Sequence, residues 1–328
     1  MSNFKAILVK QNNKEYSLDV VERSLNELPE GDVLIRVAYS CLNFKDALSA
    51  SGNKGVTKQY PHTPGIDAAG VVAHSASNQF KQGDEVIVTG YDLGMNTSGG
   101  LAEYIRVPET WVVRRPTALS LRESMLLGTA GLTAALCVNK LEHAGLNPED
   151  GAVLVTGATG GVGSIAVALL AKLGYQVVAA TGKAQEYDYL MSLGAAEVIS
   201  REALLEKQER PMLAPKWAGI IDTVGGDLLF NCVKALKYGA SAACCGLTAG
   251  VEFNANVFPF ILRGVNLLGV DSVELPLEVK QEMWSKLATT WHLNNLEKLS
   301  QEINLTDVPE AIEKILKGTH KGRYLVKV

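Results

Sequence analysis

The sequence has little excess of either charge and no long apolar run. Of 328 residues, 31 are Lys or Arg and 35 are Asp or Glu, so the formal net charge is −4. A mildly acidic surface argues against nucleic acid as a partner, because phosphate backbones are bound by basic surfaces. The longest apolar stretches, such as 164–170 and 240–247, are far shorter than the ~20 residues that span a bilayer. We therefore expect neither nucleic-acid binding nor a membrane span.

Cysteine is also scarce. The five cysteines form no CxxC pair, their number is odd, and most lie in apolar surroundings: they are Cys41, Cys137, Cys232, Cys244 and Cys245. This usage predicts reduced, buried thiols and not a disulfide framework. The first ten residues contain no basic segment followed by an apolar stretch of signal-peptide length, so we expect a cytoplasmic protein.

What the chain does contain is typical of a packed globular protein. Hydrophobic residues make up 47% and charged residues 20%, which excludes disorder for most of the chain. At roughly 150 residues per domain, the length predicts about two domains. Glycine, with 31 residues, exceeds its usual share of about 7%.

The first third of the chain predicts a β-rich domain. Short runs of β-branched residues are separated by Gly and Pro at irregular spacing, which predicts a partly open barrel with long loops. The expected strands are 5–9, 17–22, 33–40, 70–74, 84–89 and 100–107.

After Pro116 the pattern changes to an α/β one. Ser120 and Glu123 have capping-box spacing, and a helical pattern continues to about His143. From residue 152, apolar strands alternate with helices, which predicts a doubly wound parallel sheet, a Rossmann domain covered on both faces. A last strand, 322–328, is expected to pair with the first domain. The predicted ranges are 1–120 and 296–328 for the β-rich domain and 121–295 for the Rossmann domain.

The strongest local signal is the glycine-rich segment 153–163, VLVTGATGGVG, because it follows an apolar strand and opens a helix. Aligned on G-x-G-x-x-G, its three positions are Ala158, Gly160 and Gly163. Gly160 would let a pyrophosphate approach the backbone. The N–H groups of Gly161 and Val162, with the positive end of the helix dipole, would hold the phosphates.

The next strand indicates which dinucleotide binds. An NAD site usually has an acidic residue at the end of this strand to accept from the ribose hydroxyls. Here the strand ends in Thr181-Gly182-Lys183, and the first acid is Glu186. Thr181 and Lys183 could bind a 2′-phosphate, and Arg201 could stack on adenine and add charge. The sequence therefore favours NADPH, the alternative being that Lys183 and Arg201 are solvated surface charges.

With these residues in place, the chain resembles the zinc-independent medium-chain dehydrogenase/reductases, and within them the quinone oxidoreductase and acryloyl-CoA reductase branch. The resemblance runs nearly end to end. It is carried by the glycine turn and by segments 42–47 (LNFKDA), 61–70 (PHTPGIDAAG), 99–103, 180–183, 222–226 and 258–273.

The resemblance implies a GroES-like domain followed by a Rossmann domain, and it implies the cofactor contacts. Phe44 would lie beside the cofactor, at a position where the branch commonly has tyrosine. The pyrophosphate would be held by Thr159, Gly160, Gly161 and Val162. The 2′-phosphate end would be held by Thr181, Gly182, Lys183 and Arg201. The nicotinamide side would be lined by Leu247, Ile261 and Ser272.

The same comparison predicts a site without metal. Asn43 stands where zinc-dependent relatives have a cysteine, and Ile66 stands where they have the histidine of a G-H-E motif. An aliphatic side chain cannot bind zinc and an amide is a poor ligand for it. Cys41 is interpreted as a core residue.

A site of this kind suits the reduction of an activated C=C bond, in which a carbonyl or thioester oxygen takes the developing charge. Asn43 is the first candidate to polarise or position the substrate. Asp67 is a candidate proton relay or an orienter of Asn43, with a loop-capping role equally open. Lys45 and Asp46 are expected to pair with each other.

Three functions remain open. The first is an NADPH-dependent reductase of short α,β-unsaturated thioesters such as acryloyl-CoA, and the second is an NADPH-dependent quinone or enone oxidoreductase. The third is an NADPH-binding, crystallin-like protein with little catalysis. The resemblance also implies a homodimer, in which the expected strand from Val265 to Val270 pairs across a two-fold axis.

Overall fold

The computed structural model describes residues 3–13 and 15–328. The chain forms two compact units. The first comprises residues up to Thr129 together with Val273–Thr290 and Asn295–Val328, and the second comprises Ala130–Ser272 and Trp291–Asn294. Relative to the predicted ranges, residues 121–129 and 273–290 belong to the β-rich unit instead of the Rossmann unit.

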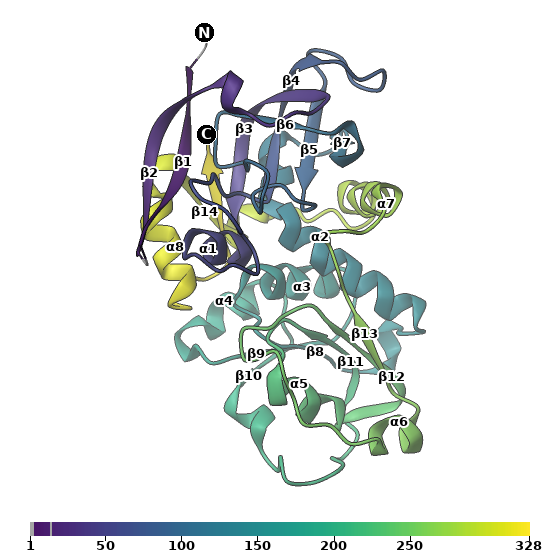
Figure 1. Ribbon diagram of the computed structural model, residues 1–328. Coiled ribbons are helices and arrows are strands. Elements are labelled where there is room, and N and C mark those ends of the chain that lie inside the picture. Colours follow the sequence, from purple (N-terminus) through teal and green to yellow (C-terminus); the bar gives the residue numbers. More distant parts are fainter. Residues whose placement is uncertain (1–2, 14) are drawn as a thin grey trace. The chain divides into compact units, whose positions relative to one another are not determined.

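The first unit is built on antiparallel strands (Figure 1). A hairpin of β1 (Asn3–Asn12) and β2 (Glu15–Ser24) stands beside a seven-stranded sheet of order β14-β15-β3-β4-β5-β7, in which β6 pairs with β3. The sheet strands are β3 (Val33–Leu42), β4 (Asp67–Ser75), β5 (Glu85–Thr89), β6 (Tyr104–Val107), β7 (Val112–Arg114), β14 (Ser300–Asn304) and β15 (Arg323–Lys327).

The C-terminal strand completes this sheet. β15 pairs antiparallel with β3, with Tyr324 opposite Leu42. The helices of the unit are α1 (Phe44–Ala50), α7 (Leu277–Ala288) and α8 (Val308–Leu316). On α7, the fully buried Lys280 donates from Nζ to the carbonyl of Thr89 at 2.6 Å. The sequence pattern does not indicate α1 or α7, since α1 is short and α7 carries alternating charges.

The second unit is a six-stranded parallel sheet of order β10-β9-β8-β11-β12-β13. Its strands are β8 (Val153–Val155), β9 (Val177–Thr181), β10 (Glu197–Ser200), β11 (Trp217–Asp222), β12 (Leu236–Cys244) and β13 (Asn266–Gly269). The connecting helices are α3 (Gly161–Lys172), α4 (Tyr187–Ser192), α5 (Gly226–Val233) and α6 (Phe258–Arg263).

The strand order and the right-handed crossovers indicate where a ligand of the parallel sheet would bind. Parallel strands joined by right-handed crossovers put α3 and α4 on one face of the sheet and α5 and α6 on the other, as Figure 1 shows. The order reverses between β8 and β11, and ligands of such sheets bind beyond the carboxyl ends of the strands at this point. The predicted fold class, a Rossmann sheet with a β-rich, partly open second domain, is confirmed.

Helix α2 (Leu121–His143) carries the boundary between the units. Gly128 has φ 50° and ψ −155°, so α2 is two helical segments joined at a kink. By length and composition alone α2 could cross a membrane, but 89% of its most apolar window is buried within the protein. The search of the sequence for uninterrupted apolar stretches did not identify α2, because glycines and threonines interrupt its apolar residues. Burial of this kind is expected of a core helix.

Candidate functional site

The turn after β8 depends on a glycine that the motif alignment did not place. Gly157, with φ 57°, begins the turn, and a Cβ there would lie 2.3 Å from Oγ1 of Thr223. The spacing in the structure is therefore Gly157-x-x-Gly160-x-x-Gly163, and Ala158 is a buried neighbour instead of the turn residue. The signal was present in the sequence as a glycine every third residue.

The other two glycines of the turn, Gly160 and Gly163, are needed for different physical reasons. A Cβ on Gly163 would lie 2.3 Å from the carbonyl oxygen of Gly157, so this residue allows α3 to pack closely on the turn. A Cβ on Gly160 would meet only that same oxygen, at 3.3 Å. Gly160 precedes α3, whose first N–H groups, including those of Gly161 and Val162, have no acceptor within the helix. This end of α3 can therefore bind an anion.

A buried carboxylate holds the turn against the next strand. Asp222, at the end of β11, accepts from Oγ1 of Thr156 at 2.6 Å and from the N–H of Gly225 at 2.7 Å. The side chain of Thr223 donates to the carbonyl of Thr156 at 2.9 Å. Burial raises the pKa of Asp222. Hydrogen bonds thus join the two loops at the switch point. The sequence analysis assigned no role to Asp222.

The residues predicted for the 2′-phosphate end lie together. Oγ1 of Thr181 is 3.3 Å from Oγ1 of Thr159 and accepts from the N–H of Lys183 at 3.1 Å. The N–H of Arg201 donates to the carbonyl of Thr181 at 2.9 Å. A Cβ on Gly182 would lie 3.4 Å from the guanidinium carbon of Arg201, so the guanidinium lies against this glycine. Burial lowers the pKa of Lys183, and Glu186 opposes that shift.

Two of the three residues predicted for the nicotinamide side lie at the same edge. Leu247, 51% exposed, follows the carboxyl end of β12. Ser272 follows β13, and its Oγ is hydrogen-bonded to Oγ1 of Thr133 at 2.8 Å.

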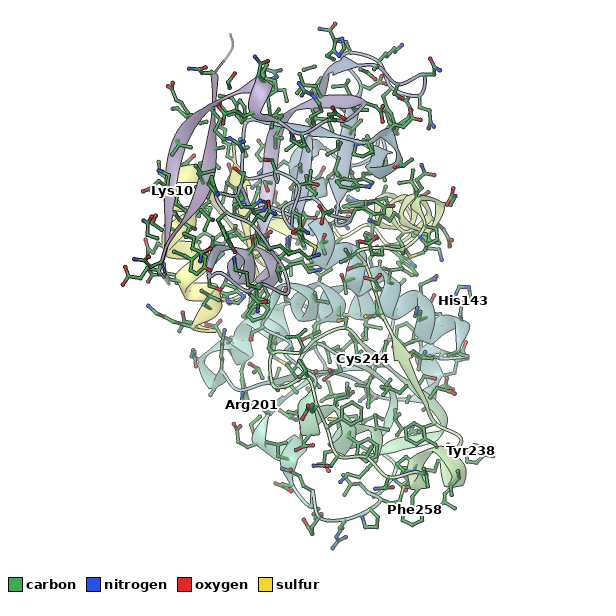
Figure 2. The ribbon with its side chains drawn as sticks, in the orientation of Figure 1. Lys10, His143, Arg201, Tyr238, Cys244 and Phe258 are labelled. Atoms are coloured by element: carbon green, nitrogen blue, oxygen red, sulfur yellow. The ribbon has the colours of Figure 1, made fainter. Side chains whose placement is uncertain are left out.

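Ile261 lies elsewhere. It is 68% exposed on α6, whose Arg263 donates to the carbonyl of Leu236 at the amino end of β12. β12 has nine residues, so its two ends are about 26 Å apart. Figure 2 places Phe258, the first residue of α6, at one end of the sheet and Cys244 toward the other. The structure therefore does not bring Ile261 to Leu247 and Ser272, because the connection from β12 to β13 must return to the amino edge.

In the first unit, Asn43 and Asp67 are in direct contact. Nδ2 of Asn43, which precedes α1, donates to Oδ2 of Asp67 at 2.8 Å. Asp67 is fully buried and also accepts from Oγ1 of Thr129 at 2.6 Å and from its N–H at 2.9 Å. This geometry suits the role of Asp67 as an orienter of Asn43.

Asp46 is the second buried carboxylate of this cluster. Oδ1 accepts from the N–H groups of Gly65 and Ile66, and Oδ2 accepts from the N–H of Asn43. Burial, and then the charge of Asp67, raise the pKa of Asp46 to about 7. The expected pair of Lys45 with Asp46 is wrong: Asp46 is turned inward to cap α1, and Nζ of Lys45 contacts Sδ of Met95 at 4.0 Å.

The cluster also contains an arginine that the sequence analysis missed. Arg323, the first residue of β15, donates from Nη1 to Oδ1 of Asn43 at 3.3 Å and from Nη2 to Sγ of Cys41 at 2.7 Å. Nη2 lies 3.8 Å from Oδ2 of Asp67. Only its position on a late strand that returns to the first domain could have indicated it. Cys41 is fully buried, as expected of a core residue, and its thiol also donates to Oδ2 of Asp67 at 3.0 Å.

The kink in α2 completes the cluster. A Cβ on Gly128 would lie 2.5 Å from Sγ of Cys41 and 2.7 Å from Oδ2 of Asp67. The kink also frees the N–H of Thr129 to reach Asp67, at the positive end of the second helical segment. Gly128 therefore combines an unusual backbone conformation with a lack of space for a side chain.

The hydrogen bonds limit what Asn43 can do. One amide hydrogen reaches Asp67 at 2.8 Å and the other faces Oδ2 of Asp46 at 3.3 Å, while Oδ1 accepts from Arg323. A flipped amide would put its oxygen against two carboxylates, so this orientation is the favourable one. Asn43 therefore has acceptor capacity left and no uncommitted donor. Phe44, beside it at the start of α1, is 36% exposed.

Among the described residues, no group of three or more His, Cys, Asp or Glu side chains is arranged to hold a metal ion. The positions that carry metal ligands in zinc-dependent relatives hold Asn43, within the cluster above, and Ile66, a buried apolar residue.

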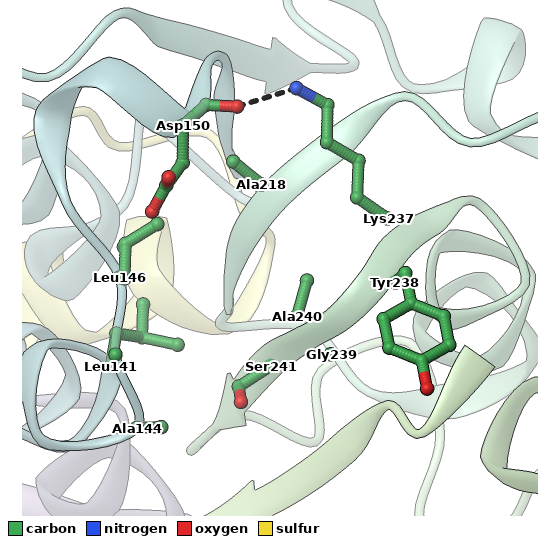
Figure 3. Close-up of a pocket in the computed structure, with 11 residues that line it drawn as sticks. Leu141, Ala144, Leu146, Asp150, Ala218, Lys237, Tyr238, Gly239, Ala240 and Ser241 are labelled. Atoms are coloured by element: carbon green, nitrogen blue, oxygen red, sulfur yellow. Dashed lines mark hydrogen bonds between the residues drawn. The ribbon is translucent and has the colours of Figure 1, made fainter.

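A cavity of about 300 Å³ lies within the second unit (Figure 3). It is lined by the end of α2 and by residues 237–241 of β12. Lys237 donates from Nζ to the carbonyl of Asp150 at 2.5 Å on its rim. None of the predicted site residues lines this cavity.

A β-rich unit and a Rossmann unit with a glycine turn define a medium-chain dehydrogenase fold. The family model described as "Alcohol dehydrogenase GroES-like domain" matches residues 29–117, and the one described as "Zinc-binding dehydrogenase" matches residues 161–289. A Bacillus subtilis protein named quinone oxidoreductase YhfP is 46% identical over 99% of both chains. Acrylyl-CoA reductase AcuI of Ruegeria pomeroyi is 43% identical, again over 99% of both.

Solved structures indicate the same family as the sequence relatives do. The yhdH oxidoreductase of Salmonella enterica, in complex with NADP, has a TM-score of 0.96 at 44% identity over 99% of both chains. Bacillus subtilis yhfP with NAD bound has a TM-score of 0.97 at 46% identity over the full length of both. The chain therefore belongs to the medium-chain dehydrogenase/reductase family of oxidoreductases, in the branch whose members are named quinone oxidoreductase and acrylyl-CoA reductase.

The different roles of Gly163 and Gly160 can be distinguished experimentally. Gly163→Ala should lower the free energy of unfolding by roughly 1–3 kcal/mol, because its Cβ would overlap backbone atoms. Gly160→Ala should leave stability near wild type, since φ there is −79° and the nearest atom is 3.3 Å away, but should weaken dinucleotide binding about tenfold or more. Denaturant unfolding and fluorescence titration with NADPH measure the two effects. Wild-type NADPH affinity in Gly160→Ala would contradict this use of the turn.

Asp46 should make stability depend on pH. Its pKa is about 7 in the folded state and 3.8 in an exposed reference, so its contribution is complete below about pH 4 and is lost as the pH rises through 7. The loss is on the order of 4 kcal/mol. Denaturant unfolding of the wild type between pH 4 and about pH 8 should show this fall, and Asp46→Asn should flatten it. Equal slopes in both proteins would rule out Asp46 as the source.

Proposed function

We propose that this protein is an NADPH-dependent reductase of activated C=C bonds, acting on short α,β-unsaturated acyl thioesters such as acryloyl-CoA. The proposal is carried by two sets of residues, one in each unit: a phosphate turn followed by a cationic, acid-free strand end, and an asparagine held by two buried carboxylates and an arginine. The relative named acrylyl-CoA reductase, 43% identical over 99% of both chains, supports the thioester as substrate.

The second unit fits NADP. The backbone at Gly160 leaves room for a phosphate, and the first turn of α3 offers N–H donors. Lys183 and Arg201 supply positive charge where an NAD site usually has an acid. The Salmonella relative crystallised with NADP supports the same assignment, whereas the Bacillus relative was crystallised with NAD. NADPH, when bound, supplies a hydride.

The residues of the first unit then have distinct roles. Asn43 positions the substrate through Oδ1, because both of its amide hydrogens already have acidic acceptors. Asp67 is the positioning residue for Asn43, and the donors from Thr129 keep its carboxylate fixed. Phe44, which is partly exposed at the start of α1, is proposed to contact the cofactor, as the family resemblance implies. Leu247 and Ser272 are assigned to the nicotinamide side.

Quinones are the second candidate substrates, because the Bacillus subtilis relative named quinone oxidoreductase is 46% identical to this chain. Both reactions need the same cofactor and the same orienting residues. A binding protein with little catalysis is the third candidate. Measured reaction rates can distinguish the three candidate functions, whereas the arrangement of the site residues does not.

Consumption of NADPH by the purified protein, with acryloyl-CoA and with a panel of quinones and enones, tests these alternatives. We expect saturable turnover of acryloyl-CoA at micromolar KM and slow turnover of quinones. Asn43→Ala should lower kcat/KM for acryloyl-CoA about 100-fold or more while NADPH affinity stays near wild type. Quinones reduced about 100-fold faster than acryloyl-CoA would favour the second candidate, and tight NADPH binding without turnover on the panel would favour the third.

Cofactor selectivity can be tested separately at Arg201. Arg201→Ala should raise the Kd for NADPH roughly tenfold and leave the Kd for NADH nearly unchanged, because only NADPH carries the 2′-phosphate. Arg210→Ala removes an equal charge from an exposed position nine residues further along the chain and is the matched control. Equal losses for NADPH and NADH would place Arg201 outside the phosphate site.

A homodimer through the Rossmann sheet edge is also proposed. Among the residues that the structure describes, β13 pairs with β12 alone, and the neighbouring α6 exposes Ile261 and Leu262. An uncovered apolar edge is commonly buried by a second copy. Light scattering should give about twice the 35.1 kDa chain mass for the wild type, and Ile261→Arg should shift it toward the monomer. Met191→Arg, on exposed α4, is the control, and a monomeric wild type would end the proposal.

A further inference from the structure

Lys280, on α7, is a buried cation to which the proposed reaction assigns no role. Its side chain is fully buried, although the ammonium carries a charge and three N–H donors. Nζ donates to the carbonyl of Thr89 at 2.6 Å and to the carbonyl of Val273 at 2.9 Å. Nζ also lies 3.3 Å from the centre of the Tyr91 ring, within the range of a cation–π contact. Burying a charge is strongly unfavourable without such partners, so the position of each partner is closely constrained.

The same set of contacts holds Tyr91 in place. Tyr91 has a left-handed backbone, with φ 52°. Its N–H donates to the carbonyl of Val273 at 3.1 Å, and its hydroxyl donates to the carbonyl of Leu275 at 3.2 Å. Its ring also stacks on Trp111, with the ring centres 5.6 Å apart. Lys280 and Tyr91 therefore bind the same short segment before α7, and they also contact each other.

Tyr91 lies at the start of a loop, residues 90–98, that is bonded to the segment supporting Asn43. The N–H of Gly90 donates to the carbonyl of Ile66 at 2.8 Å. The N–H of Ile66 donates to Oδ1 of Asp46 at 2.9 Å, and the N–H of Asn43 donates to Oδ2 of the same carboxyl group at 2.8 Å. The start of the loop is thus connected to Asn43 through two residues.

Two further contacts place this loop beside Asn43. Nζ of Lys45, two residues along the chain from Asn43, lies 4.0 Å from Sδ of Met95 in the loop. Thr89, the last residue before the loop, is opposite Asp67 in the pairing of β4 with β5. The loop therefore borders the amide assigned to the substrate.

We propose that Lys280 is a positioning residue for the substrate: its ammonium holds the loop of residues 90–98 beside Asn43, so that the loop bounds the acyl group on one side. This role rests on the proposed function. Without the ammonium, the carbonyls of Thr89 and Val273 lose a buried donor and the Tyr91 ring loses its cation. The loop then gains freedom that is lost again when the acyl group binds. Binding of the ground state and of the transition state weakens equally, so KM rises while kcat changes little.

Steady-state rates with acryloyl-CoA at saturating NADPH test the positioning role. Lys280→Met removes the charge at similar length and should raise KM about tenfold, with kcat and the Kd for NADPH within about twofold of wild type. Lys286→Met removes a partly exposed charge from the same helix and is the matched control. A variant that only loses stability would lower the apparent kcat at unchanged KM, and that result would overturn the proposal.

Tyr91 provides a second test, without a change at the buried lysine. Tyr91→Phe keeps the ring beside the ammonium and loses only the hydroxyl bond to Leu275, whereas Tyr91→Leu loses both. We expect Tyr91→Leu to raise KM about tenfold and Tyr91→Phe to raise it no more than about threefold. Equal rises in KM for the two variants would show that the contact of the cation with the ring does not position the loop.

Amide hydrogen exchange of the protein without cofactor or substrate tests the same contacts independently of activity. In Lys280→Met, peptides covering residues 89–98 should exchange about tenfold faster or more, whereas Lys286→Met should match the wild type. Unchanged exchange in this loop, or faster exchange throughout the first unit, contradicts the role of Lys280. A wild type that does not reduce acryloyl-CoA contradicts the proposed function instead, and the exchange result then decides whether Lys280 holds the loop.

Discussion

The buried carboxylate of Asp67 is the interaction on which the first unit's site depends. A buried carboxyl group needs several hydrogen-bond partners, and here they come from distant parts of the chain. Asn43 at the start of α1, Thr129 after the kink in α2 and Arg323 on β15 all converge on it. Gly128 must lack a side chain for this to occur. The carboxylate thus fixes both the amide of Asn43 and the path of three elements around it.

The Rossmann unit uses the same physical solution. Asp222, buried at the end of β11, accepts from Thr156 and from the loop that follows it. The glycine turn is therefore braced by a carboxylate before any phosphate arrives, and its N–H groups remain directed by the start of α3. In both units a buried acid, satisfied by hydroxyl and N–H donors, supplies the rigidity that a site needs. The cost of burying each carboxyl group is offset by this local set of donors.

Several site residues could be predicted from sequence because their signals are local. The proposed phosphate turn, the cationic end of β9 and the amide at position 43 each lie within a short segment, and the residues proposed for the 2′-phosphate end lie close together in the structure. Errors arose where a residue's partner lies far along the chain. Asp46 was paired with its neighbour Lys45, but it is buried against Gly65 and Ile66. Ile261 was placed with Leu247, although the chain returns to the other end of β12 between them.

The sequence by itself determined the two-unit order, the alternation of strands and helices, and the glycine turn, because periodicity and turn chemistry act over a few residues. Only the tertiary structure decided which carboxylates are buried and which groups satisfy them. Arg323 meets Asn43 across 280 positions of sequence, and Thr129 meets Asp67 across 62. Such contacts depend on strand pairing and on the kink at Gly128, which no local pattern encodes.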